Sequence, residues 1–421
     1  MNKIKGKIYC RITFCLASAL SVGSGENRHS DSDMVRDSAG DPFIPGSSLA
    51  GIYRSLLEPA DAGRYLGTGK HEDTGAGSKV VVYDARLRGE KGRSLYRSSI
   101  RDCVGLDQWK TGKEGCKFDF EVVEPGAEFV TYLEQNLEEG DRDILEDLAG
   151  AWQRHEIALG RKTMRGLGAA DHVTVRRRAF DFTEDREGEL DAWLDFDMYR
   201  EEDWEGAETV RLEDKGGRRE RGIRLEFKLR QRGGISIRRY TTAVSASEDK
   251  PQPDAEQLTW VTGEDGAETP YIPGTSWAGA FLHHMEGLAL GCTKKYFGSC
   301  ERRSQIRFHE SFIQGASPKV LTRNAVDRFT GGVVDNALFT EKMWYGGRTL
   351  LCIDLPAGTD PEFCRALAAA LTDLHMGILP VGGLTAVGRG IFEGEELLID
   401  GASVPVGEEM YGEILERLER R

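Results

Sequence analysis

The chain has 421 residues, of which 39% are hydrophobic and 30% are charged, so it is expected to be a soluble globular protein of two to three domains. Its formal net charge of −14 excludes a protein coated in positive charge for indiscriminate nucleic-acid binding. The charge is uneven, however. Residues 150–180 hold seven Lys or Arg against two acids, whereas residues 181–203 hold eleven acids against two Arg. A local basic track is therefore compatible with the sequence.

The first residues predict a β-strand rather than an export signal. Apolar side chains alternate at Ile8, Cys10, Ile12 and Phe14, and Arg11 interrupts the apolar run that a signal peptide needs. No stretch approaches the ~20 apolar residues of a membrane helix, so no membrane partner is expected. None of the eight cysteines form a Cys-x-x-Cys pair, and they are interpreted as reduced thiols in the cytoplasm.

The first half alternates strand and helix patterns. The predicted elements are a strand at 3–14, a helix from Pro45 to Leu57, a strand at 79–84, a hairpin within 99–133, a helix from Leu133 to Trp152, a glycine-rich loop at 160–168 and a strand at 172–180. The serines at the start of the first helix are suited to capping it.

The second half repeats this order. Its predicted elements are a strand at 223–229, a long polar loop, a helix from about Gly274, strands at 305–312 and 348–354 with a hairpin between them, a helix that starts at Asp360-Pro361, a glycine loop at 382–390 and a final strand. The order predicts an α+β protein of two tandem ferredoxin-like (RRM-like) domains. We place them at 1–205 and 222–421, with a linker at 206–221.

Four sequence blocks occur twice in the same order, which indicates a tandem duplication. The offset between the copies is 220 to 228 residues, far longer than a solenoid repeat. The paired blocks are 44–51 with 272–279, 78–85 with 304–311, 107–112 with 327–331, and 160–168 with 382–390.

Several of these segments resemble the RAMP superfamily, most closely the backbone subunits of type III CRISPR effector complexes. The resemblance rests on residues 32–37 and 42–49, on 101–121 and 323–339, which are similar to the family's thumb hairpin, and on the two glycine loops. It implies two tandem fused backbone domains, each with a thumb β-hairpin insertion. It also implies guide CRISPR RNA, target RNA and other effector subunits as partners.

The glycine loops and helix starts are the candidate phosphate-binding segments. Glycine lets backbone N–H groups approach a phosphate, and helix N-termini attract anions. The alternatives are a tight turn without a ligand and plain N-capping. Relatives often carry a basic residue where Ala50 and Ala278 stand, so binding at the helix starts is expected to be weaker. The candidates are Arg161, Lys162, Arg165, Gly166, Gly383 and Arg389 in the loops, and Ser47, Ser48, Thr275 and Ser276 at the helix starts.

Each hairpin carries an aromatic residue beside basic ones. Trp109 and Phe329, the latter next to Arg328, suit stacking on single-stranded bases, although both could instead belong to a local core. The resemblance implies that the thumbs wedge into the guide–target duplex and flip out a target nucleotide.

The loop between the first strand and the first helix is where the family places its target-cleaving aspartate. Asp31 matches this position best in the first half, Asp33 is a nearby competitor, and Asp254 matches best in the second half. A carboxylate can deprotonate or position a ribose 2′-hydroxyl with Mg²⁺ or another divalent ion beside it. Acidic surface loops without any catalytic role are the alternative.

A structural zinc ion is a further hypothesis. His283 or His284 with Cys292 and Cys300 could supply three ligands, and some relatives bind Zn²⁺, but the spacing matches no compact motif. Helix-face histidines and buried thiols are the alternative.

The resulting hypothesis is a metal-dependent endoribonuclease subunit that binds guide RNA and cleaves target RNA. One rival is a non-catalytic guide-binding scaffold, and another is a purely structural assembly protein. A third rival is a guide-processing ribonuclease, for which His155 and His172 flank the first glycine loop as acid–base candidates.

Overall fold

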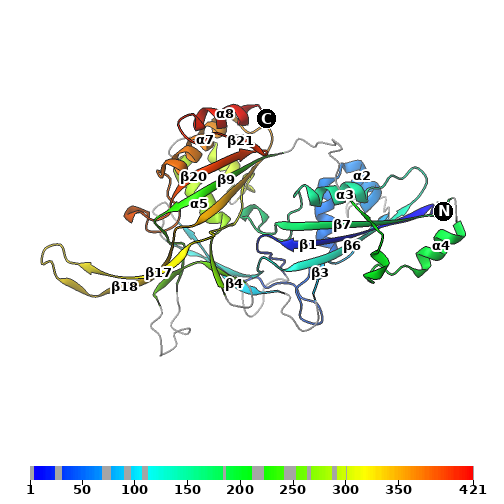
Figure 1. Ribbon diagram of the computed structural model, residues 1–421, viewed down its shortest axis with the longest axis horizontal. Helices are drawn as coiled ribbons and strands as arrows, with labels where there is room; N and C mark the ends of the chain where they lie inside the picture. Colours follow the sequence, from blue (N-terminus) through cyan, green and yellow to red (C-terminus); the bar gives the residue numbers. More distant parts are fainter. Residues whose placement is uncertain are drawn as a thin grey trace. The chain divides into compact units, whose positions relative to one another are not determined.

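The chain divides into two compact units (Figure 1). Unit 1 comprises Met1–Thr163 and Leu167–Gly217, and unit 2 comprises Met164–Gly166 and Arg218–Arg421. The computed structural model describes residues 4–23, 31–68, 77–89, 96–106, 112–183, 186–210, 222–240, 253–262, 267–286, 292–299 and 301–420.

Unit 1 is built on an antiparallel sheet with the strand order β2-β6-β1-β7-β8, in which β3 also pairs with β6. Two further strands, β4 and β5, form a separate antiparallel ribbon. The elements are β1 Gly6–Leu16, α1 Gly46–Leu56, α2 Pro59–Leu66, β2 Val80–Val82, β3 Arg86–Leu87, β4 Ser98–Leu106, β5 Gly112–Val123, β6 Glu128–Leu137, α3 Leu145–Gln153, η1 Thr163–Arg165, β7 Ala170–Asp181, α4 Arg186–Asp195, η2 Glu202–Trp204 and β8 Glu208–Thr209.

Unit 2 has a corresponding main sheet with the order β15-β19-β9-β20-β21, also antiparallel. Its first elements are β9 Ile223–Arg232, β10 Gly234–Ile235, β11 Arg238–Tyr240, β12 Ala255–Gln257, β13 Thr259–Thr262, β14 Ala267–Ile272, α5 Gly274–Glu286, α6 Thr293–Phe297, β15 Arg307–Phe308 and β16 Ser311–Phe312. The remaining ones are β17 Ser317–Val326, β18 Val333–Tyr345, β19 Arg348–Leu355, α7 Pro361–Met376, η4 Thr385–Val387, β20 Ile391–Ile399, β21 Ala402–Val404 and α8 Met410–Glu419.

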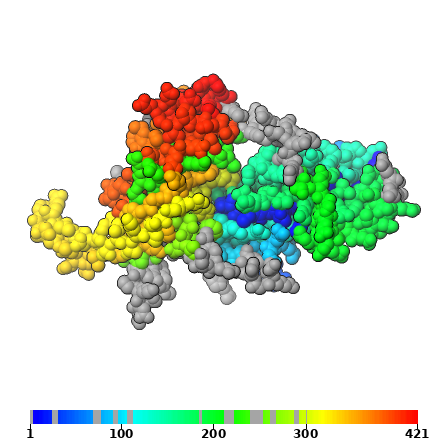
Figure 2. All heavy atoms as spheres, in the orientation of Figure 1, coloured from blue at the N-terminus to red at the C-terminus, as the bar shows by residue number. Residues whose placement is uncertain are grey.

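The antiparallel β17–β18 ribbon extends away from the body of unit 2, and it is the yellow finger in Figure 2. The C-terminal part of β18 pairs with β10 and β12. These pairs hold the end of the ribbon that is nearer the body of unit 2 in a small second sheet.

The duplication predicted from the sequence blocks is visible in the topology. Strands β2-β6-β1-β7 of unit 1 and β15-β19-β9-β20 of unit 2 follow the same order, with the first strand of each unit in a central position. In each unit a helix, α1 or α5, follows the first of these four strands along the chain. Another helix, α3 or α7, follows the third of them, which is β6 in unit 1 and β19 in unit 2. Both units are therefore α+β, as predicted.

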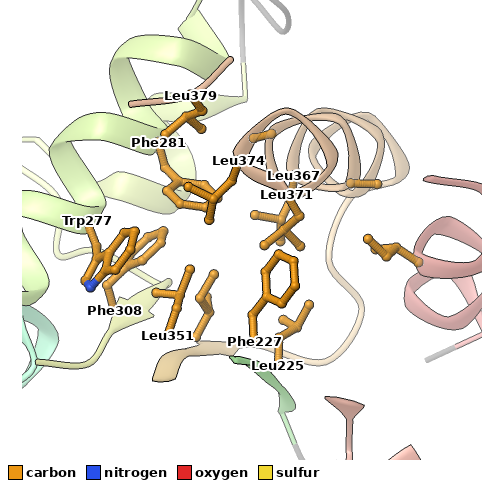
Figure 3. Close-up of a cluster of buried hydrophobic side chains, with 14 of the residues drawn as sticks. Leu225, Phe227, Trp277, Phe281, Phe308, Leu351, Leu367, Leu371, Leu374 and Leu379 are labelled. Atoms are coloured by element: carbon orange, nitrogen blue, oxygen red, sulfur yellow. The ribbon is translucent and has the colours of Figure 1, made fainter. Parts of the chain in front are cut away.

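Alternating apolar residues build the two cores. In unit 1, Ile8, Cys10 and Ile12 of β1 face the helices and are at most 2% exposed. In unit 2, Leu225 and Phe227 of β9 meet the apolar face of α7, which Leu367, Leu371 and Leu374 provide (Figure 3). Burying a side chain of this size contributes about 1.5–3 kcal/mol, so these two clusters stabilise each unit independently.

The opposite face of the unit 1 sheet carries a second, aromatic cluster, covered by residues 186–207, which we call the cap. Tyr9 of β1 and Tyr132 of β6 pack against Trp204 and Phe196 of the cap. The indole N–H of Trp193 donates a hydrogen bond to the Tyr9 hydroxyl at 2.9 Å. The cap holds most of the acidic run at 181–203, so that run is a folded cover rather than a charged linker.

The cap is also held by an ion pair. Arg11 of β1, only 6% exposed, donates two hydrogen bonds to the Glu201 carboxylate, through Nη1 to Oε1 at 2.6 Å and through Nη2 to Oε2. Planar guanidinium and carboxylate groups pair in this bidentate way with high geometric specificity. This pair therefore fixes the place of the cap on the sheet.

Three sequence-based details are corrected or completed by the fold. The helix predicted from Leu133 to Trp152 is wrong in its first part, because Leu133 lies in strand β6 and a turn at Gly140 separates that strand from α3. The N-cap of α1 is Pro45, so the serines lie inside the first turn rather than capping it. The predicted final strand, β20, is followed by β21 and α8.

The interval 206–221 predicted as the linker begins with residues that belong to the sheet of unit 1. Glu208 and Thr209 form β8 and pair with β7. Residues 211–221 lie outside the described part of the chain. In the described residues, no helix combines the length and the apolar character needed to cross a membrane.

Candidate nucleic-acid interface

The two glycine loops have the same left-handed backbone. Gly160 and Gly168 in unit 1 have φ values of 70° and 75°, and Gly382 and Gly390 in unit 2 have φ values of 91° and 71°. At Gly168 and Gly390, a Cβ atom would collide with the carbonyl oxygen of the residue nine positions earlier. Only glycine meets both requirements, which explains its spacing in both loops.

Backbone hydrogen bonds anchor both loops in the same way. The N–H of Arg161 donates to the carbonyl oxygen of Ser21 at 2.7 Å, and the N–H of Gly383 donates to that of Ser236 at 2.7 Å. A short 3-10 helix follows at the same place in each loop, η1 in unit 1 and η4 in unit 2. The sequence blocks at 160–168 and 382–390 are thus structural equivalents.

The side chains of the two loops differ in charge. The first glycine loop, 160–168, carries cations at three positions, whereas the second, 382–390, carries neutral residues at the equivalent ones. The pairs are Arg161 with Gly383, Lys162 with Leu384, and Arg165 with Val387. Arg389 is the basic residue of the second loop, and its guanidinium lies 5.4 Å from the centroid of the Tyr345 ring. Gly166 has a φ of 90° and is buried.

The first glycine loop contacts both neighbouring segments of the candidate interface. The ammonium of Lys162 lies 4.3 Å from the centroid of the Phe120 ring and 5.1 Å from that of Phe118, both on β5. Nη1 of Arg161 donates a hydrogen bond to the Ser32 hydroxyl at 3.1 Å. Unit 1 thereby joins its glycine loop, its ribbon and the loop of Asp31 in one cluster.

Asp31 and Asp254 occupy equivalent positions beside the two ribbons. The Oδ2 atom of Asp31 accepts a hydrogen bond from the backbone N–H of Asp119 at 3.0 Å. The Oδ2 atom of Asp254 accepts one from the backbone N–H of Thr340 at 2.7 Å. Both carboxylates are exposed, whereas the competitor Asp33 is half-buried.

The equivalence of Asp119 and Thr340 follows from burial as well. Strands β5 and β18 have the same alternation of exposed and buried residues over the twelve residues of β5, and it aligns Asp119 with Thr340. Neither partner was predicted from the sequence. The duplicated spacing between the aspartates and the ribbons was the signal that could have found them.

The tip of the β17–β18 ribbon presents Phe329. Its side chain is 84% exposed, which excludes the alternative of a local core for this residue. The carboxylate of Asp327 accepts the backbone N–H groups of Phe329 and Thr330 at 2.9 and 2.7 Å. These bonds hold the pKa of Asp327 below its ordinary value and fix the turn. Arg328 lies over the Phe329 ring at 5.0 Å. The matching Trp109 lies outside the described residues.

The helix N-termini have backbone donors that are already occupied. The first N–H of α1, at Gly46, donates to Oδ1 of Asp84 at 2.8 Å, so a carboxylate takes the place that a phosphate would need. The N–H groups of Ser48 and Ser276 donate to the carbonyl oxygens of Pro45 and Pro273, both at 2.9 Å. The side chains of Ser47 and Thr275 are exposed.

The chemistry of the aspartates fits a hard divalent cation. Mg²⁺ prefers oxygen ligands and is commonly held by one or two carboxylates together with water and substrate phosphates. In the described part of the chain, no group of three or more His, Cys, Asp or Glu side chains is arranged to hold a metal ion. An ion at Asp31 or Asp254 would therefore be shared with RNA phosphates.

The proposed zinc ligands do not form a described cluster. His283 is exposed and Cys292 is buried, and burial raises the pKa of the Cys292 thiol, which disfavours the thiolate that zinc needs. His284 pairs instead with Asp373, at 2.6 Å between Nε2 and Oδ2. Cys300 lies outside the described residues, so the zinc site stays a prediction.

The basic run at 176–178 is paired within unit 1. Arg177 donates to Asp143 at 2.7 Å, Arg178 donates to the carbonyl oxygen of Asp203 at 2.5 Å, and Arg176 lies 3.6 Å from Glu201. These side chains bind the cap and α3 region rather than forming an RNA track.

The two histidines beside the first glycine loop have different environments. Nδ1 of His155 lies 3.3 Å from the carbonyl oxygen of Ala170, and the His172 side chain is 83% exposed. Both residues have positive φ values, 56° and 48°.

The family model of the RAMP superfamily matches residues 16–171 and 259–393, which is more than half of the chain and falls in both units. The chain belongs to the RAMP superfamily. Membership supports a CRISPR-associated, RNA-binding subunit. The two matched regions contain both glycine loops and both ribbons, and the first also contains Asp31. A comparison with curated proteins returns no match.

Proposed function

We propose that the chain is a guide-RNA-binding backbone subunit of a type III CRISPR effector and cleaves target RNA at two aspartates. The observation that carries this proposal is the equivalent placement of Asp31 and Asp254. Each carboxylate is tied through Oδ2 to a backbone N–H of the neighbouring ribbon. An acidic surface loop that serves only solubility does not require the same hydrogen bond between its aspartate and the ribbon in both units.

We infer ferredoxin-like topology for both units and assign the two ribbons as thumbs. The β-α-β-β-α-β order with the first strand in the centre supports the topology. The exposed Phe329 at a fixed tip supports a thumb that stacks on a base of the target strand, because a base presents a flat π-face of any sequence.

Guide RNA would follow the first glycine loop most closely. Arg161, Lys162 and Arg165 supply positive charge there, and single-stranded RNA binds such tracks through its phosphates. The other subunits of the effector and the target RNA are the remaining partners in this proposal.

The proposed reaction is a transesterification. Because Oδ2 accepts the ribbon N–H, Oδ1 of Asp31 or Asp254 is left to take the proton of a ribose 2′-hydroxyl. The 2′-oxygen attacks the adjacent phosphorus, the bond to the 5′-oxygen breaks, and that oxygen takes a proton from water. A bound Mg²⁺ supplies stabilisation of the charge that develops on the phosphate oxygens.

Single and double alanine variants of Asp31 and Asp254 test the proposal in the assembled RNA–protein complex. Each single change should abolish one of two cuts in the target RNA, with a loss of roughly 10²–10⁴-fold in rate, because a general base contributes on that scale. Guide and target binding should be unchanged. The Asp33→Ala variant is the matched control and should keep both cuts.

If the double variant cleaves target RNA at a rate within about threefold of the wild-type rate, the nuclease assignment is wrong. If the wild-type complex binds target RNA but makes no cut, the scaffold function is correct instead.

A further inference from the structure

Asp119, on β5 of unit 1, forms a reciprocal pair with Asp31. The backbone N–H of Asp31 donates to Oδ1 of Asp119 at 2.8 Å, while the backbone N–H of Asp119 donates to Oδ2 of Asp31 at 3.0 Å. Each residue is thus both donor and acceptor for the other. Together the two bonds fix the main chain at Asp31 and the orientation of its carboxylate.

Unit 2 reaches the same result with different atoms. The N–H of Asp254 donates to the backbone carbonyl oxygen of Thr340 at 2.8 Å, and the N–H of Thr340 donates to Oδ2 of Asp254 at 2.7 Å. The bond to the carboxylate is therefore common to both units. The bond to the aspartate's own N–H comes from the main chain in unit 2 and from a side chain in unit 1.

The residues after Asp31 are attached to β5 independently of Asp119. The N–H of Glu121 donates to the carbonyl oxygen of Ser32 at 3.0 Å, and Oε2 of Glu121 accepts the N–H of Met34 at 2.9 Å. The Ser32 hydroxyl also accepts a bond from Arg161. Loss of the Asp119 side chain would therefore remove the bond to the N–H of Asp31, while the carboxylate of Asp31 keeps its bond to the main chain of Asp119 and Ser32 and Met34 stay in place.

We propose that Asp119 is a positioning residue for Asp31, which holds the catalytic loop of unit 1 through its carboxylate oxygen. The proposal rests on the proposed cleavage of target RNA at Asp31. A displacement of about 1 Å in a catalytic group can cost about 10²-fold in rate. The role requires an acceptor at Oδ1 and does not require its negative charge.

The chemistry predicts opposite outcomes for two substitutions at this position. Asp119→Asn keeps an oxygen at Oδ1 that accepts the N–H of Asp31, so cleavage should persist. Valine is a good strand former and carries no hydrogen-bond acceptor. In Asp119→Val the strand should therefore fold, while the N–H of Asp31 loses its bond to Oδ1 of residue 119. In unit 2, Thr340→Val is the matched control, because Thr340 bonds to Asp254 through its backbone carbonyl oxygen and its backbone N–H.

The experiment measures the rates of the two cuts separately, from the lengths of the RNA products, in the assembled complex with saturating target RNA. Asp119→Val should slow the Asp31 cut roughly tenfold to hundredfold and leave the Asp254 cut unchanged. Asp119→Asn should stay within about threefold of the wild type, and Thr340→Val should alter neither cut.

Two results overturn the inference. The first is an Asp31 cut of wild-type rate in Asp119→Val, and the second is an equally slow cut in Asp119→Asn, which would show that the charge matters. Asp31→Ala separates this failure from that of the proposed function. If Asp31→Ala keeps its cut, the nuclease assignment fails. If it loses the cut while Asp119→Val does not, the positioning role alone fails.

Discussion

The glycine loops of the two units share their backbone and differ in their side chains. Both use left-handed glycines and the same backbone hydrogen bond to the segment after the first strand. The first glycine loop places three cations on this framework, and the second places Gly383, Leu384 and Val387 at the same positions. The duplication has thus preserved the backbone geometry of the loops and has let their charge diverge. Shape and charge are separable parts of the candidate interface.

The bases of the two ribbons diverge in the same manner. At one equivalent position of β5 and β18, unit 1 has Phe120 beneath Lys162, and unit 2 has Glu341. The Glu341 side chain is 1% exposed and accepts hydrogen bonds from Arg323 at 2.5 Å, from Arg238 at 3.1 Å and from the Ser236 hydroxyl. Unit 2 therefore ties its ribbon, through the buried Glu341, to Ser236, whose carbonyl oxygen accepts the N–H of Gly383 in the glycine loop.

The largest effect is expected from Glu341→Ala. Removal of one partner from a buried ion pair leaves charges without compensation and costs about 3 kcal/mol of unfolding free energy. Denaturant unfolding of the full chain measures this change. Glu395→Ala is the matched control, because it breaks the ion pair with Arg348, whose side chain is 70% exposed, and should cost less than about 1 kcal/mol. Equal costs for the two variants would contradict a stabilising role of the buried cluster.

The next largest effect is expected from an exchange of the loop side chains. The triple change Arg161→Gly, Lys162→Leu and Arg165→Val gives unit 1 the residues of unit 2. Affinity for a single-stranded guide RNA should fall about 30-fold, which corresponds to about 2 kcal/mol. The slope of log affinity against log salt should also decrease by about 2, since each phosphate contact contributes about 0.7. Binding measured by fluorescence anisotropy at several salt concentrations gives both quantities.

The reverse exchange is the control for this prediction. Gly383→Arg, Leu384→Lys and Val387→Arg should strengthen binding and steepen the salt dependence. Leu384 has a φ of 55°, close to the 57° of Lys162, so the backbone accepts the change. An unchanged salt slope in both triple variants would show that the loops do not contact RNA phosphates.

The smallest effect is expected from acid. In unit 2, His309 and Asp354 form a half-buried pair at 2.6 Å, and the equivalent pair in unit 1 is Tyr83 and Glu134. Burial lowers the pKa of His309 below its ordinary value. The stability contributed by the neutral imidazole is therefore complete above the ordinary histidine pKa of about 6.5 and decreases as the pH falls below it.

Thermal unfolding of the full chain between pH 7 and pH 5 measures this dependence, with an expected loss of no more than about 1 kcal/mol. His309→Tyr, which introduces the residue of unit 1, should reduce it. If the variant and the wild type lose the same stability on acidification, His309 is not the titrating group.

Local patterns in the sequence predicted most of the fold, because each core depends on nearby periodicity. The alternation at Ile8, Cys10 and Ile12 and the helical face of Leu367 and Leu371 are both borne out. The helix predicted from Leu133 failed because its apolar spacing ran across the turn at Gly140. A strand that ends and a helix that begins within a few residues can share one helical period by chance.

The contacts of the candidate site could not be predicted from local patterns. Asp31 and Asp119 are separated by 88 residues, and Gly46 and Asp84 by 38. Hydrogen bonds between residues this far apart depend on tertiary packing and produce no periodic pattern in the sequence. The aspartates themselves were matched to one family position through the resemblance, whereas their hydrogen-bond partners on β5 and β18 became visible only in the structure.

The cap gives unit 1 a property that its sheet order alone would not suggest. In RNA-recognition domains with a four-stranded sheet, aromatic residues on the open face stack directly on bases. Here Tyr9 and Tyr132 already pack against Phe196 and Trp204 with tilted rings, and Arg11 already binds a carboxylate. The cap thus occupies this face of the sheet with its own groups, with aromatic rings where bases would lie and a carboxylate where a phosphate would lie. An RNA strand would have to displace the cap to reach this face of the sheet.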